Sequence, residues 1–585
     1  MEPEAAPAPT LLLGPMLRHV EETSASLWVE TNQAGTVGVE TDAGTWVART
    51  FGVHGHHYAL VALDGLAAGA ELPYRVTLDG HPVWPESSDY PPSVIRTPGR
   101  GVPLRLAFGS CRTSVPHDAA GNRKHGVDAL RSYAVHMASA HEPDWPGLAL
   151  LLGDQVYADV TSNAMQEFIR SRRDINEPPG AELRDFEEYA HLYGLAWSEP
   201  AIRWLFSTLP TAMIFDDHDI RDDWNASLSW RRSMEATSWW HDRIVAGLGS
   251  YWVYQHLGNL SPAERARDPL WQRIAGHDGD AELDLSADID AFADRADREP
   301  TTYRWSYCRD FDDVRLLVVD SRAARALEPG SRSLLDDEEM AWVEQRLHGG
   351  FRHLLIGTSL PFLLPNGLHH VESWDEAISE GAWGRTWSRI GETVRQAVDL
   401  EHWAAFQSSF RRVAGLVTDT ADGRRGTAPR TVAFLSGDVH FSYASEVKRD
   451  TGSRIIQAVC SPMRNPMPPA LRLFASSMAY GPARLVGSVL ARAAGVPPPP
   501  LDWSGIRGPW FDNNLAILED SEQGLRISWS RGVVKHDDGG QPRWEIVADI
   551  TVGQRDAGGT TSRQSAMNRL RRRWASLRRV LRGRR

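Results

Sequence analysis

The 585-residue chain has few cysteines and no long hydrophobic run, and each absence removes a class of protein. Its three cysteines are sparse and odd in number, so they do not form the disulfide framework of a small secreted protein. No run reaches the ~20 apolar residues that a membrane-spanning helix needs. The first residues show neither a secretion signal nor a twin arginine, so the expected location is cytoplasmic.

Signatures of nucleotide and nucleic-acid binding are missing as well. The sequence has no Walker A motif, and no G-x-G-x-x-G follows a predicted strand, so nucleotide-binding and dinucleotide-binding enzymes lose support. The formal net charge of -13 disfavours nonspecific binding of nucleic acid, and no specific nucleic-acid partner is expected. A chain of this length exceeds one ordinary core, so two or three domains are expected.

The pattern along the chain predicts two folded regions. Residues 1–10 are expected to be disordered. Residues 11–98 contain short alternating strands separated by Gly, Asp and Asn, which is typical of an immunoglobulin-like or fibronectin-like β-sandwich. From 102 to 552 strands alternate with helices, which predicts an α/β domain. Within it, a helical insertion is expected at about 238–299 and a Pro-rich excursion at about 466–500.

The C-terminal stretch 553–585 is rich in arginine. Within residues 567–585, leucines and a tryptophan recur at helical spacing between the arginines, which predicts a basic amphipathic helix. Such a helix can bind an anionic membrane surface, so the protein would be membrane-peripheral. A disordered tail and contact with RNA are equally open interpretations.

Four apolar runs in the second region read as buried strands, and each ends in residues that can bind metal. The runs are LRLAFGSC, LALLLGDQVY, AMIFDDHD and VAFLSGDVH. Asp and His are poor strand formers and are costly to bury unpaired. If the four strands share a sheet, their carboxyl ends meet at one edge, which is where α/β proteins bind ligands. The pattern therefore predicts a metal site with more than one ion.

Two of these motifs place candidate ligands close together in sequence. Asp154 can bridge two cations, and Tyr157 would lie near it if a helix starts there. A tyrosinate favours a strongly Lewis-acidic ion such as ferric iron. Asp438 and His440 would lie on the same side of an extended chain. The alternative for both motifs is a capping aspartate with a packed aromatic or histidine side chain.

The segment DDHDIRDD concentrates negative charge that needs cations or arginines nearby. Its single histidine, His218, can ligate a metal or donate a proton or hydrogen bond to a substrate oxyanion. Arg112, Arg322 and Arg464 are candidate clamps for an anionic substrate, because a guanidinium fork matches phosphate oxygens.

The mixture of ligand types indicates a reaction. A set rich in carboxylates, with tyrosine and cysteine, does not suit a structural zinc site. It suits a hard or trivalent ion beside an oxygen-loving divalent ion such as calcium. Two close ions can polarise a phosphoryl group and activate a water for in-line attack, so phosphoester hydrolysis is the leading reaction class.

With Cys111, GDQVYAD, DDHD and SGDVH in that order, the chain resembles the alkaline phosphatase D family, the PhoD-like metallophosphatases. The resemblance covers nearly the whole chain. It implies a four-layer α/β/β/α metallophosphoesterase core of the calcineurin-like phosphoesterase type, related to purple acid phosphatases. It also implies a site for iron (Fe³⁺) and calcium (Ca²⁺), and hydrolysis of small phosphate monoesters and diesters.

The same resemblance assigns residue roles. Cys111, Asp154 and Tyr157 would ligate the iron, and Asp154 would also bridge to calcium. Asp217 would take the position of the Asn in the Gly-Asn-His motif of related phosphoesterases, with His218 poised beside the phosphate. The implied metal ligands are Cys111, Asp154, Tyr157, Asp217, Asp438 and His440, and the implied catalytic residues are Arg112 and His218.

Two features depart from the family pattern. Many members carry a pair of asparagines where this chain has Asp222 and Asp223, which adds negative charge near the implied calcium. Exported relatives carry a twin-arginine signal, which this sequence does not show. Two alternative functions stay open: a phospholipase-like phosphodiesterase that works at a membrane, and a non-catalytic metal-binding protein with the same fold.

Overall fold

The computed structural model describes residues 8–86, 89–140, 145–469, 471–472, 476, 483–521, 523–534 and 541–553. The first seven residues and nearly all of the basic C-terminal stretch lie outside the described residues. The predictions of a disordered N-terminus and of a basic amphipathic helix within 567–585 therefore stay predictions.

The N-terminal region contains two sheets that enclose an apolar core, and their strands pair antiparallel except for β5 and β14. The first has the strand order β1-β2-β6-β5-β14 and the second the order β4-β3-β8-β9, while β7 and β10 form a separate pair. Their bounds are β1 (Leu11–Val20), β2 (Ser24–Thr31), β3 (Thr36–Thr41), β4 (Gly44–Arg49), β5 (Phe51–Val53), β6 (His56–Asp64), β7 (Glu71–Pro73), β8 (Arg75–Leu78), β9 (His81–Trp84), β10 (Val94–Arg96) and β14 (Leu283–Asp284). Strands of both sheets bury Leu27, Val37 and Val76 in this core, so the predicted β-sandwich is confirmed. One edge strand was not predicted, because β14 comes from a distant helical segment and pairs with β5.

Two mixed sheets form the core of the larger region. The six-stranded sheet has the order β13-β12-β11-β22-β23-β24, and the seven-stranded sheet the order β15-β16-β17-β18-β20-β19-β21. The bounds are β11 (Arg105–Gly109), β12 (Leu148–Leu152), β13 (Thr211–Ile214), β15 (Tyr307–Phe311), β16 (Val314–Val319), β17 (His353–Thr358), β18 (Thr431–Ser436), β19 (Ser442–Val447), β20 (Arg454–Val459), β21 (Trp503–Trp510), β22 (Leu515–Ser521), β23 (Gly524–Val533) and β24 (Arg543–Val552). The four motif-bearing strands are β11, β12, β13 and β18, and their runs of leucine, valine and alanine are buried as predicted.

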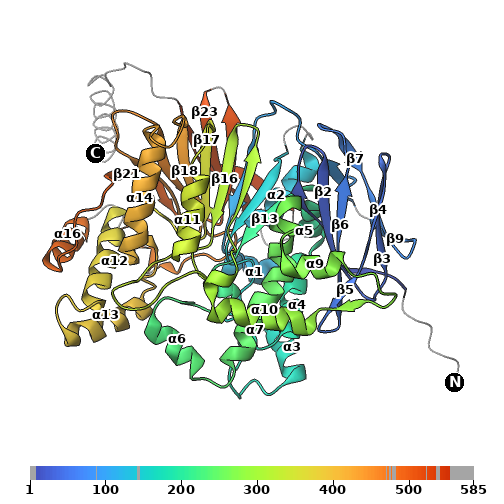
Figure 1. Ribbon diagram of the computed structural model, residues 1–585, viewed down its shortest axis with the longest axis horizontal. Helices are drawn as coiled ribbons and strands as arrows, with labels where there is room; N and C mark the ends of the chain where they lie inside the picture. The colour runs from blue at the N-terminus through green and yellow to red at the C-terminus, as the bar shows by residue number, and fades with distance from the viewer. Residues whose placement is uncertain are drawn as a thin grey trace, which may run out of the picture.

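Helices cover the outer faces of the two sheets, which completes the predicted α/β/β/α layers (Figure 1). On one side α2 (Ala129–Ser139) contacts β22, β23 and β24. On the other, α11 (Asp337–Arg346) and α14 (Gln407–Ala421) bury their apolar faces against β16, β17 and β18. Between the sheets, Gly357 of β17 packs so closely on Leu150 and Leu152 that an added Cβ would lie 3.2 Å from the Leu152 side chain.

Twelve further α-helices are present in the described residues. They are α1 (Ala119–His125), α3 (Asn163–Arg172), α4 (Phe186–Trp197), α5 (Pro200–Thr208), α6 (Leu228–Glu235), α7 (Trp240–Tyr251), α8 (Pro262–Arg265), α9 (Pro269–Ala275), α10 (Ser286–Arg298), α12 (Asn366–Ser379), α13 (Arg385–Ala397) and α16 (Ala483–Ala493). In the described part of the chain, none of these helices combines the length and apolar character required to cross a bilayer.

The expectation of a single sheet edge is corrected by the structure. β11, β12 and β13 are parallel neighbours in one sheet, whereas β18 belongs to the other. The strand ends nevertheless meet, because the two sheets stack. The Asp438 amide, beyond β18, donates to the Ser110 hydroxyl, beyond β11, at 3.1 Å. The sheets therefore share one edge region, built from two layers.

A histidine joins the N-terminal sandwich to the larger region. Glu30 of β2 contacts His56 Nδ1 at 2.8 Å, and Glu187 of α4 contacts its Nε2 at 2.8 Å. Two ring nitrogens that both face carboxylates must both donate, so His56 is an imidazolium here. Burial opposes this charge, but the hydrogen bonds and charges of Glu30 and Glu187 outweigh burial and raise the pKa of His56 above its ordinary value.

We expect His56→Gln to lower the free energy of unfolding by about 1–3 kcal/mol in mildly acidic buffer, because the buried Glu30 loses its charged partner. A raised folded pKa gives stability that is complete below the ordinary histidine pKa of about 6.5. That stability is lost as the pH rises through the folded pKa. The cost of the substitution should therefore shrink at alkaline pH in urea unfolding curves. The exposed His348→Gln is the control, and a cost of His56→Gln that is constant with pH would contradict this account.

Candidate metal centre

Four predicted ligands have a left-handed backbone conformation at or just beyond a strand end. The φ angles are 58° at Cys111, 50° at Asp154, 65° at Asp438 and 56° at His440. Only ten non-glycine residues in the described ranges adopt positive φ. Such conformations cost on the order of 1–3 kcal/mol each and gather at functional sites. The extended backbone expected between Asp438 and His440 is therefore wrong, because both residues turn sharply after β18.

Two groups of potential ligand atoms share Asp154. Cys111, Asp154 and His440 offer atoms that all lie within 4.8 Å of one another, and so do Asp154, Asp216 and Asp217. Two buried oxygens of the second group have no hydrogen-bond partner, namely Asp154 Oδ1 and Asp216 Oδ2. Buried acceptors without a partner are costly unless a ligand satisfies them, so this donor set fits bound cations.

Tyr157 lies beside Asp154, although no helix starts there. The chain from 154 to 160 is a loop of bends, and this corrects the expected first helical turn. The Tyr157 hydroxyl donates to Asp154 Oδ2 at 3.4 Å, and the Tyr157 ring lies 4.6 Å from the ring of His218. The predicted neighbourhood of Asp154 and Tyr157 is therefore present, but tertiary packing and not helical spacing creates it.

The charge state of this group depends on what neutralises it. Burial, reinforced by the charges of Asp154 and Asp438, raises the pKa of the Cys111 thiol well above its usual value. Burial and neighbouring carboxylates likewise raise the pKa of Asp154 well above its usual value and that of Asp217 to about 6. A bound cation removes this penalty, because it favours the ionised forms of its ligands.

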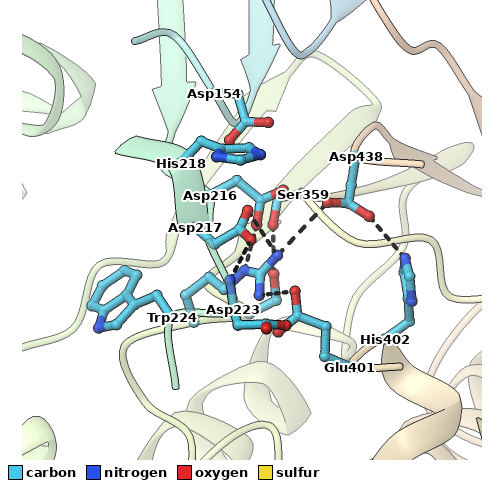
Figure 2. A network of polar contacts seen from close by, with 12 residues as sticks. Asp154, Asp216, Asp217, His218, Asp223, Trp224, Ser359, Glu401, His402 and Asp438 are labelled. Atoms are coloured by element: carbon cyan, nitrogen blue, oxygen red, sulfur yellow. Dashed lines mark hydrogen bonds and ion pairs between the residues drawn. The ribbon is translucent and has the colours of Figure 1, made fainter. Parts of the chain in front are cut away.

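Arg322 is the hub of an acidic network whose carboxylates are labelled in Figure 2. Its guanidinium is fully buried and forms ion pairs with four carboxylates, those of Asp216, Asp217, Glu401 and Asp438. The other side of Glu401 pairs with Arg325 at 3.0 Å. The sequence suggested Arg322 as a substrate clamp, but these contacts make it a fixed counter-charge for the site.

Asp438 lies outside the two ligand groups and is held by other residues. Its Oδ2 accepts from His402 Nε2 at 2.8 Å, and His402 Nδ1 contacts the buried Glu372 of α12 at 2.7 Å. With carboxylates at both ring nitrogens, His402 carries a proton on each. Asp438 Oδ1 lies 3.7 Å from Arg322 Nη2, so Asp438 is held between this histidine and the guanidinium.

His218 points into the same region and is oriented by a second carboxylate. Its Nδ1 lies 2.9 Å from Asp159, which also accepts the Asp222 amide at 2.7 Å. Burial would lower the pKa of His218, but the charges of Asp159 and Asp217 raise it well above its usual value. His218 is therefore a proton carrier with one nitrogen committed to Asp159.

Asp222 and Asp223, where the resemblance led us to expect asparagines, lie next to this network. The Asp223 amide donates to Asp217 Oδ2 at 3.0 Å. Asp222, Asp223 and Asp399 form another acidic group. Burial, with the charges of Glu401 and Asp222, raises the pKa of Asp223 to about 9.

Arg112 and Arg464 are engaged elsewhere. Arg112 Nε donates to Asp128 at 2.9 Å and its Nη1 to the Ala196 carbonyl at 2.7 Å. Arg464 donates to backbone carbonyls, including that of Pro116 at 2.8 Å. The role of Arg112 as a phosphate clamp stays a prediction, and its contacts give it no support.

Sequence reasoning missed the supporting residues of the site. Asp159 ends the motif GDQVYAD, so its signal was present but not interpreted. Glu401 and His402 follow α13 in a loop, and Glu372 lies on α12. No strand end or turn motif marks these three residues. Only the tertiary fold brings them to Arg322 and Asp438.

Two stacked mixed sheets with a buried cluster of carboxylate, thiol and imidazole groups at a common edge define a metallophosphoesterase fold. A family model described as PhoD-like phosphatase matches residues 125–469, more than half of the chain. The chain belongs to the PhoD-like phosphatase family and is a phosphoric ester hydrolase. The matched segment contains all the predicted site residues except Cys111 and Arg112. Residues 8–95 match a domain of unknown function (DUF7800).

The solved structure of PhoD shows the same fold at low sequence identity. The structure of PhoD is 14% identical, with a TM-score of 0.55, over 96% of this chain and 94% of that one. The purple acid phosphatase PPD1 from yellow lupin (Lupinus luteus) seeds is 10% identical, with a TM-score of 0.45, over 93% of this chain and 74% of that one. No curated protein matches the sequence.

Proposed function

We propose that the chain hydrolyses small phosphate monoesters or diesters at a centre that holds ferric iron and calcium. The observation that carries this proposal is that Asp154 belongs to both ligand groups. A carboxylate common to two groups is what a bridged pair of cations requires. The family membership supplies the phosphoester substrate class.

The donor types suggest how the two cations divide the ligands. Thiolate, imidazole and carboxylate in the group of Cys111, Asp154 and His440 suit a transition metal, and the Tyr157 phenolate suits ferric iron. The group of Asp154, Asp216 and Asp217 offers oxygen only, which suits calcium. Asp438 completes the set implied by the family resemblance. Such a pair of cations, when bound, polarises a phosphoryl group and activates a water.

The protein's own residues would carry the proton transfer. Asp159 accepts from His218 Nδ1–H and fixes the ring, which leaves Nε2–H to donate. In our mechanism His218 protonates the departing oxygen as the ester bond breaks, while Arg322 holds the carboxylates in place from behind. General acid catalysis of this kind contributes about 10²–10⁴-fold.

The His218 assignment predicts a dependence on the leaving group. His218→Asn should lower kcat by about 10²–10⁴-fold for an alkyl phosphate, whose leaving oxygen needs a proton. The loss should be much smaller for a nitrophenyl phosphate, whose leaving group departs as an anion. Asp159→Asn should show the same pattern in weaker form. An equal loss on both esters would show that His218 is not the acid.

The Tyr157 assignment predicts a colour. A ferric tyrosinate produces a charge-transfer band in the visible spectrum, so the iron-loaded protein should absorb there and Tyr157→Phe should lose the band while keeping bound iron. Tyr133→Phe, a buried tyrosine on α2, is the matched control. Iron binding with an unchanged band in Tyr157→Phe would remove Tyr157 from the ligand set.

A further inference from the structure

Two helices at one end of the molecule turn apolar side chains outward. α16 packs on α12 through the buried small residues Gly487 and Ala491. An added Cβ at Gly487 would lie 3.1 Å from the His370 side chain, so this face fits closely. The opposite face of α16 exposes Leu485, Val486 and Val489, which are 70%, 59% and 62% exposed.

The neighbouring helix α13 also turns apolar side chains outward and small or charged residues inward. Its inward positions include Gly391 and Arg395, and Arg395 is buried and paired with Asp375 of α12. Trp387 and Ile390 are exposed on the helix, and Val398 is exposed directly after it. An amphipathic helix on a globular protein normally buries its apolar stripe. Here much of the stripe faces solvent.

A tryptophan joins the exposed faces of the two helices. The Trp383 indole lies 5.3 Å from the Trp387 ring and donates to the Ala493 carbonyl of α16 at 3.2 Å. Six of the thirteen large apolar side chains exposed in the described ranges belong to these two helices or follow them directly. We call them the α13–α16 surface: Trp387, Ile390, Val398, Leu485, Val486 and Val489. Gathered apolar exposure of this kind marks an interaction site.

The exposed charged residues of the two helices themselves are arginines, while the exposed Asp399 follows Val398 directly. Arg385 and Arg389 on α13 and Arg492 on α16 are exposed. The only acid on either helix, Glu392, is engaged by Ser227, Ser229 and Arg395. The chain as a whole carries a net charge of -13, so this basic and apolar face is an exception on an acidic protein.

We propose that the α13–α16 surface binds an anionic lipid bilayer. Apolar side chains beside arginines are the composition of helices that lie in a membrane interface, where the apolar residues enter the acyl boundary and the arginines meet anionic headgroups. A second copy of the chain would bring arginines against arginines. The Arg-rich C-terminal stretch would also place arginines against the arginines of this surface. Charge therefore favours an anionic lipid surface as the binding partner.

The chain connects the α13–α16 surface to residues that support the metal centre. The chain passes from α13 through Asp399 and Glu401 to His402, and α12 carries Glu372, the partner of His402. The proposal rests on the two helices alone and holds whichever phosphoester the site hydrolyses.

Vesicle co-sedimentation of the full-length protein tests this proposal. The probes are vesicles of phosphatidylcholine alone and vesicles of equal parts phosphatidylcholine and phosphatidylglycerol. We expect binding to the mixed vesicles only. Leu485→Glu with Val489→Glu should lower the vesicle partition coefficient by about tenfold or more, because two apolar anchors are lost and two repelled charges are gained. Arg385→Gln with Arg389→Gln should weaken binding to a lesser degree.

The matched control is Val47→Glu, an exposed apolar residue of β4 at the opposite end of the molecule, which should bind like wild type (Figure 1). Hydrolysis of a soluble aryl phosphate and the unfolding temperature should be unchanged in all these variants. Failure of vesicle binding can therefore be distinguished from failure of the proposed enzymatic function. Wild-type binding by the Leu485→Glu, Val489→Glu variant would overturn it, as would equal loss in Val47→Glu. If the wild-type protein does not bind the mixed vesicles, the proposal is wrong. It is equally wrong if the protein is a dimer that these substitutions dissociate while vesicle binding is absent.

Discussion

Asp154→Asn should nearly abolish phosphoester hydrolysis. The bridging carboxylate is common to both ligand groups, so its loss weakens both cation sites at once. Metal ions contribute several kcal/mol to transition-state stabilisation, and each 1.36 kcal/mol is tenfold, so we expect kcat to fall by about 10²–10³-fold or more. The amide keeps the shape of the side chain, so the fold should survive. Steady-state hydrolysis of an aryl phosphate, measured with the metal content of each preparation, checks this.

The same substitution should have the opposite effect on the stability of the metal-free protein. Burial and the surrounding acids Asp216, Asp217 and Asp219 disfavour ionised Asp154. A neutral amide removes that repulsion, so the chelator-treated variant should unfold at a higher temperature than chelator-treated wild type. Asp520→Asn is the control, because Asp520 is buried at the other end of the sheets and pairs with Arg352. Full activity of Asp154→Asn would refute the bridging role.

Arg322→Met should cause the largest loss of stability. It removes the fully buried counter-charge of Asp216 and Glu401, and breaking a buried pair from one side costs about 3–5 kcal/mol. The metal-loaded protein should lose less, since cations also neutralise these acids. Urea unfolding with and without bound metal measures both values.

Two further variants make the Arg322 prediction specific. Arg184→Gln breaks a half-exposed ion pair with Asp242 and should cost less than about 1 kcal/mol. Adding Asp216→Asn to Arg322→Met removes a buried carboxylate that has lost its ion-pair partner and should recover part of the lost stability. If the double variant is less stable than Arg322→Met alone, Arg322 does not act as the counter-charge of Asp216.

The sequence was informative where chemistry follows a strand directly. GDQVYAD and SGDVH lie at the ends of buried apolar runs, and the structure brings Asp154 and His440 into one group with Cys111. Local pattern could not show that β18 lies in a different sheet from β12, because strand order depends on long-range pairing. The helical turn considered at Tyr157 is absent for the same reason. Packing against His218, and not helical spacing, places its ring.

The partners of the site were beyond local pattern altogether. His402 lies 36 residues before Asp438 in the chain, and Arg322 lies 106 residues after Asp216. Periodicity also could not reveal the orientation of α13. A regular apolar stripe identifies an amphipathic helix, but it does not say whether the stripe faces the core or solvent.

Metal content is the most direct test of the central claim that a bridged pair of cations hydrolyses the ester. The purified full-length protein should contain iron and calcium by elemental analysis and should hydrolyse an aryl phosphate. Chelation should remove the metals and the activity together, and both should return when iron and calcium are added back. A folded, metal-free protein that hydrolyses the ester at the same rate would contradict the account.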